Sequence, residues 1–355
     1  MDRTLLFLDK VLMDAGDGCA RGVELFNLNL IRDLTRLQWA VTAPVHPDWL
    51  ERVRACAEPG RIEAFPSVGF GPIAAGRLLR ALRGRTFAAL LLGNVANRLT
   101  MISTLLRMAR IAPQCALIAH REPTRRCLFA QKAWPTTVVA VNRQIAGHFE
   151  RFGFSRVHVH YGVTDADRFF PAPAPRADDA VHFCVLGQLD NAWKGADTAV
   201  AAFELLPEDV RRRCRLHLAS FRTPPDFGDT RIRAYAWMDV NGIPDFLRGM
   251  DAMIVPSRDE KVMRETFSQA MVQGMLSGLP LLANRLPILE EKLDEGGGLV
   301  FDGPAGLRDA IVRLANDSDE RARMGARARA VALQRYVWDT RVFADRFLPG
   351  CSAAR

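Results

Sequence analysis

Residues 252–283 read AMIVPSRDEKVMRETFSQAMVQGMLSGLPLLA and contain a strand, a loop, a helix and a second strand in that order. The apolar run Ala252–Pro256 predicts a buried strand, and the polar residues after it predict a loop. A helix is predicted from about Thr266 to Gly278, where glycine ends it, and Leu281–Ala283 predicts the next strand. A strand, a crossover helix and a second strand form a parallel pair, so the segment indicates an α/β fold.

The same alternation of short apolar runs with amphipathic helical stretches extends along the whole chain of 355 residues. The predicted strands before residue 170 are Leu5–Asp9, Trp39–Thr42, Ala88–Leu92, Ala116–His120, Val138–Val141 and Val157–His160. Those after it are Val181–Leu186, Arg215–Ala219, Ile232–Trp237, Ala252–Pro256, Leu281–Ala283 and Gly298–Phe301. Predicted helices include Val23–Leu34, Thr100–Ala109, Arg143–Phe152, Glu320–Gln334 and Thr340–Leu348. Parallel sheets covered by helices on both faces are therefore expected.

The alternating prolines in Pro171-Ala172-Pro173-Ala174-Pro175 cannot extend a helix or a central strand, and they suit an exposed connection. The length of the chain also favours two domains over one. We therefore predict an N-terminal domain over residues 1–170 and a C-terminal domain over residues 171–335, facing one another across a cleft.

Composition narrows the class of protein. Apolar residues make up 49% of the chain and charged residues 25%, as in soluble globular proteins. No apolar run approaches the ~20 residues of a membrane-spanning helix, and no signal sequence precedes the first predicted strand, so we expect a cytoplasmic protein. The seven cysteines are scattered without a C-x-x-C pair, which argues against a disulfide framework and against a zinc knuckle.

The net charge of +8 comes from arginine, because the chain has only five lysines. Either genome composition or an anionic partner explains this bias, and no nucleic-acid-binding module is recognisable. Arg77, Arg80, Arg83 and Arg85 alternate with Leu78, Leu79 and Leu82, and a second segment carries Arg107 and Arg110. These segments suit either an anionic membrane surface at the inner face of the membrane or a solvated arginine-rich helix.

Glu265 lies where the predicted loop after Pro256 meets the next helix, which is where ligands bind in open α/β sheets. Free backbone N–H groups at a helix start favour a diphosphate. Gln273 lies about two turns along that helix. The stretch resembles the P-S-x-x-E-G-F-G-x-x-x-x-E-A-M-A-x-G-x-P signature of retaining GT-B glycosyltransferases of the sucrose-synthase and mannosyltransferase type, often called family four.

The resemblance implies that Glu265 contacts the transferred sugar and that Gln273 holds the ribose, with an amide where the family has a carboxylate. Thr266, Phe267 and Ser268 would then line the donor site. Pro-Ser-x-x-Glu ends on Glu260, so this residue is the alternative for the first glutamate.

Three further motifs carry the resemblance. Residues 187–195, GQLDNAWKG, resemble the G-R-L-x-x-x-K-G loop, which implies that Gly187, Gln188 and Lys194 bind the leaving diphosphate, with Gln188 in place of an arginine. Gly22 resembles part of the G-G-x-E loop beside the donor phosphates. His120 in AHREP resembles the histidine of the H-D-x-x-P turn beside the donor sugar.

Two structural motifs extend the resemblance over nearly the whole chain. Residues 161–171 resemble the P-N-G-V-D-x-x-x-F-x-P link between the two GT-B domains, and residues 335–339 resemble the F-S-W-x tail. The resemblance implies two Rossmann-like domains and a C-terminal helix, residues 336–355, that crosses back to the first domain.

The implied activity is transfer of a sugar from a nucleotide-diphosphate sugar, with retention of configuration, to a glycan, lipid-linked or small-molecule acceptor, as in cell-surface polysaccharide or glycoconjugate synthesis. The implied catalytic residues are Glu265, Lys194 and His120. No metal, cofactor or nucleic-acid partner is expected, and no D-x-D follows a candidate strand. The replacements Gln188 and Gln273 keep open a non-catalytic nucleotide-sugar-binding protein. A GT-B epimerase and a Rossmann oxidoreductase are less well supported, because no dinucleotide fingerprint lies in register.

Overall fold

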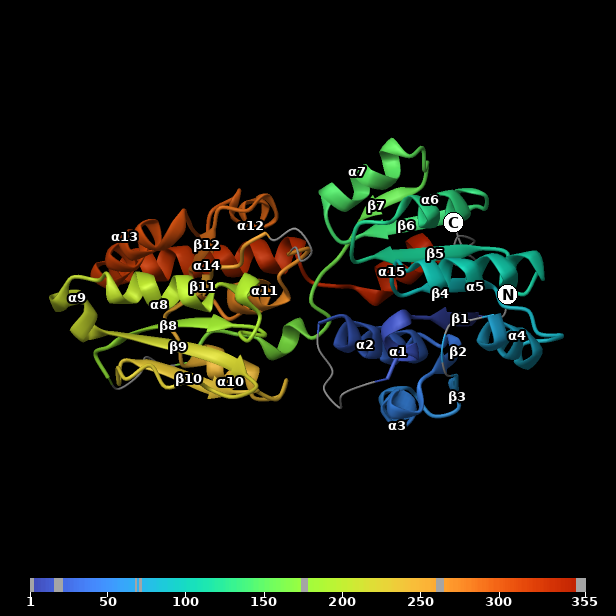
Figure 1. Cartoon of the computed structure of the whole chain (residues 1–355), viewed down its shortest axis with the longest axis horizontal. Helices are drawn as coiled ribbons and strands as arrows, with labels where there is room; N and C mark the ends of the chain where they lie inside the picture. The colour runs from blue at the N-terminus through green and yellow to red at the C-terminus, as the bar shows by residue number, and fades with distance from the viewer. Residues whose placement is uncertain are drawn as a thin grey trace. The chain divides into compact units, whose positions relative to one another are not determined.

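The computed structural model describes residues 3–15, 22–67, 69, 72–173, 178–259 and 265–348, apart from the side chain of Arg98. The chain divides into two compact units. The first comprises Met1–Thr164 and Trp338–Arg355, and the second comprises Asp165–Val337. Figure 1 shows the strands of each unit as a sheet with helices packed around it.

The first unit contains a seven-stranded parallel sheet in the order β3-β2-β1-β4-β5-β6-β7. Its strands are β1 (Thr4–Leu8), β2 (Ala40–Val45), β3 (Ile62–Pro66), β4 (Ala89–Leu92), β5 (Cys115–Ala119), β6 (Thr136–Ala140) and β7 (Val157–Val159). Its helices are α1 (Lys10–Met13), α2 (Gly22–Arg36), α3 (Pro47–Cys56), α4 (Pro72–Ala81), α5 (Asn97–Met108), α6 (Arg125–Lys132), α7 (Arg143–Arg151) and α15 (Thr340–Phe347). The order of strands reverses between β1 and β4, because the connections after β1 and β4 run to opposite edges of the sheet.

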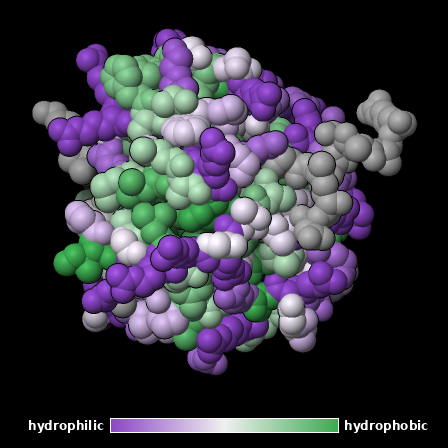
Figure 2. Space-filling model, turned by 90° about the vertical axis from the view of Figure 1, so that its right-hand side faces the viewer, coloured by the Kyte–Doolittle hydropathy of each residue, from purple (hydrophilic) through white to green (hydrophobic). Residues whose placement is uncertain are grey.

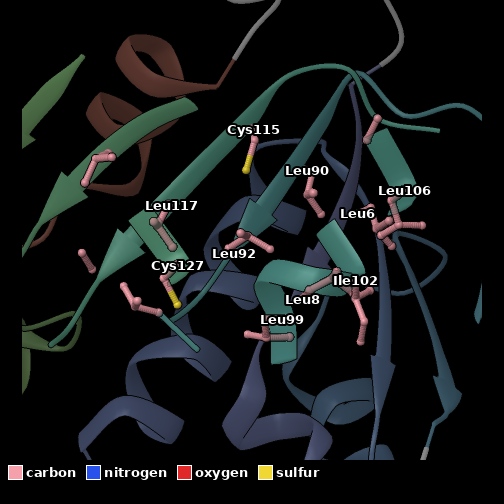
Figure 3. Close-up of a cluster of buried hydrophobic side chains, with 14 of the residues drawn as sticks. Leu6, Leu8, Leu90, Leu92, Leu99, Ile102, Leu106, Cys115, Leu117 and Cys127 are labelled. Carbon is pink, nitrogen blue, oxygen red and sulfur yellow. The ribbon is translucent and has the colours of Figure 1, made fainter. Parts of the chain in front are cut away.

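Both faces of this sheet are buried by helices. Successive side chains on a strand point to opposite sides, so each strand contributes to both core clusters. Leu6 and Leu8 of β1 face the cluster formed with α4, α5, α6 and α7, whereas Leu5 and Phe7 face the cluster formed with α2, α3 and α15. Figure 3 shows the first cluster, in which leucines from adjacent strands meet the inner side of α5. Helices α4 to α7 therefore cover one face of the sheet and expose their other side.

The C-terminal segment packs within the first unit, as predicted. The Trp338 backbone N–H donates to the Val163 carbonyl at 3.0 Å, and the Trp338 ring packs edge-on against Phe26 of α2 at 4.8 Å. Phe343 of α15 is fully buried in the same cluster. Apolar burial of these rings attaches the end of the chain to the first sheet.

The second unit contains a six-stranded parallel sheet in the order β10-β9-β8-β11-β12-β13. Its strands are β8 (Val181–Leu186), β9 (Cys214–Phe221), β10 (Ile232–Ala236), β11 (Ala252–Val255), β12 (Leu281–Asn284) and β13 (Gly298–Phe301). Its α-helices are α8 (Ala196–Glu204), α9 (Glu208–Arg213), α10 (Ile243–Arg248), α11 (Gln269–Leu276), α12 (Pro287–Leu293), α13 (Gly303–Asn316) and α14 (Ser318–Arg335). The order of strands reverses between β8 and β11, so the loops after these two strands lie at the switch point where α/β sheets bind ligands.

The structure confirms the α/β class with two Rossmann-like parallel sheets. Two differences from the predicted elements have a clear physical reason. Strand β3 was not predicted, because Ile62–Pro66 is short and ends in proline, which is tolerated at the edge of a sheet. Helix α11 begins at Gln269 and not near Thr266, because Ser268 adopts a left-handed conformation with φ of 57°. Among the described helices, none is long and apolar enough to cross a membrane.

Candidate functional site

Two loops of the second unit meet at its switch point: residues 187–195 after β8 and residues 256–259 after β11. Gly195 has φ of 72°, and a Cβ atom placed on it would lie 2.1 Å from the Pro256 carbonyl oxygen. Only glycine therefore permits this close approach. The Arg258 backbone N–H donates to the Trp193 carbonyl at 2.7 Å, which joins the two loops.

This approach brings Lys194 and Glu265 into direct contact although 71 residues separate them in sequence. The Lys194 Nζ lies 2.7 Å from Glu265 Oε2, and the two side chains are 18% and 8% exposed. The Lys194 ammonium also lies 4.2 Å from the centre of the Trp193 ring. The site therefore contains a largely buried ion pair with an aromatic ring beside the cation.

Glu265 is held by two more groups, one after the end of strand β11 and one in its own loop. Ser257 Oγ lies 3.3 Å from Oε2, and the Ser268 backbone N–H donates to Oε1 at 3.0 Å. Burial alone would raise the pKa of Glu265, but the charge and hydrogen bond of Lys194 and the Ser268 N–H outweigh it and hold the pKa below its usual value. Glu265 is therefore a carboxylate at neutral pH.

A second ammonium group lies near the pair and was not singled out from the sequence. Lys292 of α12 is 2% exposed, and its Nζ donates to the Ile288 carbonyl at 3.3 Å. The same Nζ lies 4.7 Å from the ring centre of Phe267 and 5.2 Å from that of Tyr336. Burial lowers the pKa of Lys292 to about 8, against the opposing charges of Glu291 and Glu265. The scarcity of lysine in the chain was the one signal that could have drawn attention to it.

The other predicted donor-binding residues of this unit lie in the loop after β8, just before α11 and within α11. Gly187 lies next to the Lys194 side chain, since a Cβ atom on it would be 3.6 Å from Lys194 Cδ. Gln188 Oε1 accepts a hydrogen bond from Asn191 Nδ2 at 3.2 Å within the same loop. Phe267 and Gln273 are buried, and Thr266 is half-buried. The alternative first glutamate, Glu260, lies outside the described residues.

Two predicted site residues, Gly22 and His120, belong to the first unit. Gly22 is the exposed first residue of α2, and His120 follows β5. The His120 ring packs edge-on against Phe26 at 5.4 Å and Tyr161 at 5.0 Å. Burial, helped by the charge of Arg121, lowers the pKa of His120 to about 3, so the imidazole is neutral. Its buried Nε2 has no hydrogen-bond partner.

Asp9 and Asn27 are functional candidates that the sequence analysis missed. Asp9 follows β1 at the switch point of the first sheet, and its Oδ1 accepts from the Val11 N–H at 2.7 Å and the Leu12 N–H at 3.1 Å. Its Oδ2 and both amide atoms of Asn27 are buried. Burial raises the pKa of Asp9 to about 6, even though the two backbone hydrogen bonds oppose the shift. The sequence signal that could have identified them is position: Asp9 directly follows the first predicted strand, and Asn27 lies in the helix after it.

Over the described residues, no group of three or more histidine, cysteine, aspartate or glutamate side chains could hold a metal ion. The residues around the ion pair supply a carboxylate, two ammonium groups, a loop amide and aromatic rings. Such a set can bind a diphosphate through cations and N–H groups and can hydrogen-bond sugar hydroxyls through the carboxylate.

Residues 180–317 match the family model described as Glycosyl transferases group 1. The curated D-inositol 3-phosphate glycosyltransferase of Xylanimonas cellulosilytica is 28% identical over 165 residues, which cover 41% of this chain and 36% of that protein. A Thermobifida fusca protein that carries the name glutamate–cysteine ligase 2 is 28% identical over 156 residues, which cover 39% of this chain and 34% of that protein. The chain thus spans about a third of the length of these curated relatives.

Among solved structures, that of HepE from Anabaena in complex with UDP-glucose is similar over 97% of this chain and 98% of that chain, with a TM-score of 0.73 and 15% identity. At this identity the likeness concerns the fold. The matched residues 180–317 include Gly187, Lys194, Glu265 and Lys292. The family match thus covers most of the second unit, and the likeness to HepE covers the fold of nearly the whole chain.

Proposed function

We propose that this protein is a retaining glycosyltransferase that transfers a sugar from a nucleotide-diphosphate sugar to a hydroxyl group of a glycan, lipid-linked or small-molecule acceptor, without a metal ion or cofactor. The observation that supports it best is the contact of Lys194 with Glu265 at the switch point between β8 and β11. An ammonium group and a carboxylate that meet at this edge offer one partner for a diphosphate and one for a sugar.

In the proposed reaction, the bond between the anomeric carbon of the donor sugar and the leaving phosphate oxygen breaks. A bond from that carbon to the acceptor oxygen forms on the same face, and the acceptor hydroxyl proton moves to the leaving phosphate. Lys194 stabilises the negative charge that develops on the phosphate in a site largely shielded from water. Glu265 orients the sugar hydroxyls, and neutral His120 is proposed to donate or accept a hydrogen bond beside the sugar.

Donor binding requires Lys194 to exchange partners. In the structure its ammonium pairs with Glu265, so a diphosphate must compete with that carboxylate for the same cation. The nearby charge of Lys292 keeps a positive potential at Glu265 while Lys194 turns to the phosphate. We propose that this second cation allows Glu265 to stay ionised in the donor complex.

The direct test is incubation of the purified protein with a panel of nucleotide sugars, read by thermal stabilisation and by release of the nucleoside diphosphate. UDP-glucose is the first donor to try, because the HepE complex contains it. Stabilisation by one donor, turnover unchanged by EDTA and a product with the donor's anomeric configuration are expected. An inverted product would disprove retention, and loss of turnover in EDTA would disprove the metal-independent mechanism.

A non-catalytic nucleotide-sugar-binding protein is the second candidate. It is favoured by Gln188, whose amide is engaged by Asn191 and offers no positive charge to the diphosphate. Stabilisation by a nucleotide sugar without any hydrolysis or transfer product would establish this reading, and any transfer product would exclude it.

A further inference from the structure

The positive charge of the chain is concentrated in one part of the first unit. Residues 64–149 contain eleven arginines and one lysine but a single acidic residue, Glu122. This surplus exceeds the net charge of +8 for the whole chain, so the remaining residues together are acidic. Arginine is about as frequent in the second unit as in this stretch, so the local surplus of positive charge arises because acidic residues are almost absent from residues 64–149.

These residues build the helices that cover one face of the first sheet. The inner sides of α4, α5 and α6 pack against β1, β4 and β5 in one core cluster, so their outer sides point away from the same sheet. No acidic residue occurs within α4, α5 or α6. We call the outer side of these three helices the α4–α6 surface, and Figure 1 shows α4 and α5 at the right-hand end of the first unit.

Large apolar side chains lie on the α4–α6 surface. Among the described residues, the three most exposed large hydrophobic side chains are Ile73 of α4 at 75%, Phe129 of α6 at 67% and Met108 of α5 at 65%. Met101 of α5 is also exposed. Figure 2 looks at this end of the molecule and shows hydrophobic side chains among hydrophilic ones. Such a patch on an otherwise polar protein marks an interaction site.

Exposed arginines lie on or next to the same three helices. They are Arg77 and Arg80 on α4, Arg110 after α5, and Arg125 and Arg126 on α6. The sequence alone suggested a surface made of Leu78, Leu82 and several arginines, and the structure differs from this expectation. Leu78 and Leu82 are core residues.

Two of the arginines expected on the surface have other roles. Arg85 donates to Glu63 Oε1 at 2.9 Å and is partly neutralised. Arg107 is buried and donates to the Pro135 carbonyl at 2.7 Å. The surface is therefore formed by a different set of residues, but its charge remains positive.

We propose that the α4–α6 surface docks on an anionic lipid bilayer, with Ile73, Met108 and Phe129 inserted at the headgroup level and the flanking arginines on the lipid phosphates. Arginine near an anionic membrane gains electrostatic attraction, while apolar side chains gain by burial among the acyl chains. Nucleic acid would satisfy the arginines but not the exposed isoleucine, methionine and phenylalanine side chains. The inference does not depend on the proposed reaction, because docking requires neither donor nor turnover.

The experiment is co-sedimentation of the full chain with vesicles of phosphatidylcholine containing 30% phosphatidylglycerol, compared with phosphatidylcholine alone, at low and high salt. Binding to the anionic vesicles that weakens as salt rises is expected. The charge-reversal variant Arg77→Glu/Arg80→Glu and the apolar variant Ile73→Ser/Phe129→Ser are each expected to bind at least about tenfold more weakly. Their melting temperatures are measured to show that both remain folded.

Matched controls lie in the second unit. Arg212→Glu/Arg213→Glu makes the same charge change at exposed positions of α9, and Leu333→Ser removes an exposed leucine of α14. Both are expected to bind vesicles like the unaltered chain. Absence of binding to anionic vesicles would overturn the proposal, as would an equal loss in the controls. Binding to single-stranded or duplex nucleic acid that survives Ile73→Ser/Phe129→Ser, without vesicle binding, would assign the surface to nucleic acid instead.

Discussion

Replacing Lys194 by methionine is the most informative perturbation of the proposed site, because methionine keeps much of the side-chain volume and removes the charge. If Lys194 stabilises the leaving phosphate, the loss is comparable to removing one oxyanion donor, ~2.7–4 kcal/mol of transition-state stabilisation or about 10²–10³-fold in turnover. The assay is release of nucleoside diphosphate at saturating donor. Unchanged turnover would remove Lys194 from the mechanism.

The same substitution leaves Glu265 buried without its nearest cation. Removing one partner of a buried pair destabilises a protein by ~3–5 kcal/mol. The 18% exposure of Lys194 and the neighbouring charge of Lys292 place the expected loss at the lower end, about 3 kcal/mol in the free energy of unfolding. Chemical denaturation at pH 7 measures it.

The pH dependence of this loss identifies its cause. In the unaltered chain the pKa of Glu265 is lowered, so its contribution is present above the unfolded pKa near 4.5 and is lost as pH falls through the folded pKa. In Lys194→Met the charge that opposes the effect of burial is gone, so the pKa of Glu265 should rise above its unfolded value of 4.5. Ionisation of Glu265 above pH 4.5 then destabilises the folded state. The gap in stability between the two proteins should therefore widen from pH 4 to pH 7.

The double variant Lys194→Met/Glu265→Gln separates structure from catalysis. It removes both charges, so most of the stability should return and the widening gap should vanish, while turnover stays low. Lys10→Met is the control, because it removes a half-exposed lysine paired with Asp14 at 2.6 Å in the first unit and should change neither quantity measurably. Recovery of turnover in the double variant would show that the pair has a structural role only.

Three further outcomes are expected. The pKa of Lys292 is about 8 in the folded chain against 10.5 for the free side chain, so the unfolded state binds more protons between these values. The unaltered chain should therefore gain up to about 3 kcal/mol relative to Lys292→Met between pH 7 and pH 10.5, and a constant difference in denaturation midpoints would contradict this. Gly195→Ala should be less stable than Gly228→Ala, because Gly228 also has a positive φ but has open space around it. Gly228→Ala should lose only ~1–2 kcal/mol in the free energy of unfolding, and an equal loss in both variants would refute the close approach of Gly195 to Pro256. Burial lowers the pKa of His120 to about 3, so His120 should not titrate near pH 6.5. The pH profiles of turnover of the unaltered chain and of His120→Asn should therefore have the same shape around pH 6.5, and a step there that only the unaltered chain shows would contradict this.

The sequence by itself determined the α/β class and most of the strands. Runs such as Ala89–Leu92 and Ala252–Val255 are apolar and buried along their whole length and are bounded by turn residues, so local patterning defines them. Strand β3 was not predicted because Ile62–Pro66 is stabilised by hydrogen bonds to β2, and a pattern of neighbouring residues does not report pairing with a distant strand. The start of α11 escaped because the Glu265 carboxylate accepts the Ser268 N–H at 3.0 Å and holds the loop outside the helix.

The tertiary structure alone decided which charges meet and which are exposed. Lys194, Glu265 and Lys292 are far apart in sequence, and their mutual effect on ionisation depends on burial and on distances that only the assembled sheet sets. The same holds for Arg107, which a sequence pattern places on a surface and packing buries. Periodicity along the chain reports which residues prefer to be buried, whereas desolvation and pairing depend on neighbours that the folded sheet brings from distant segments.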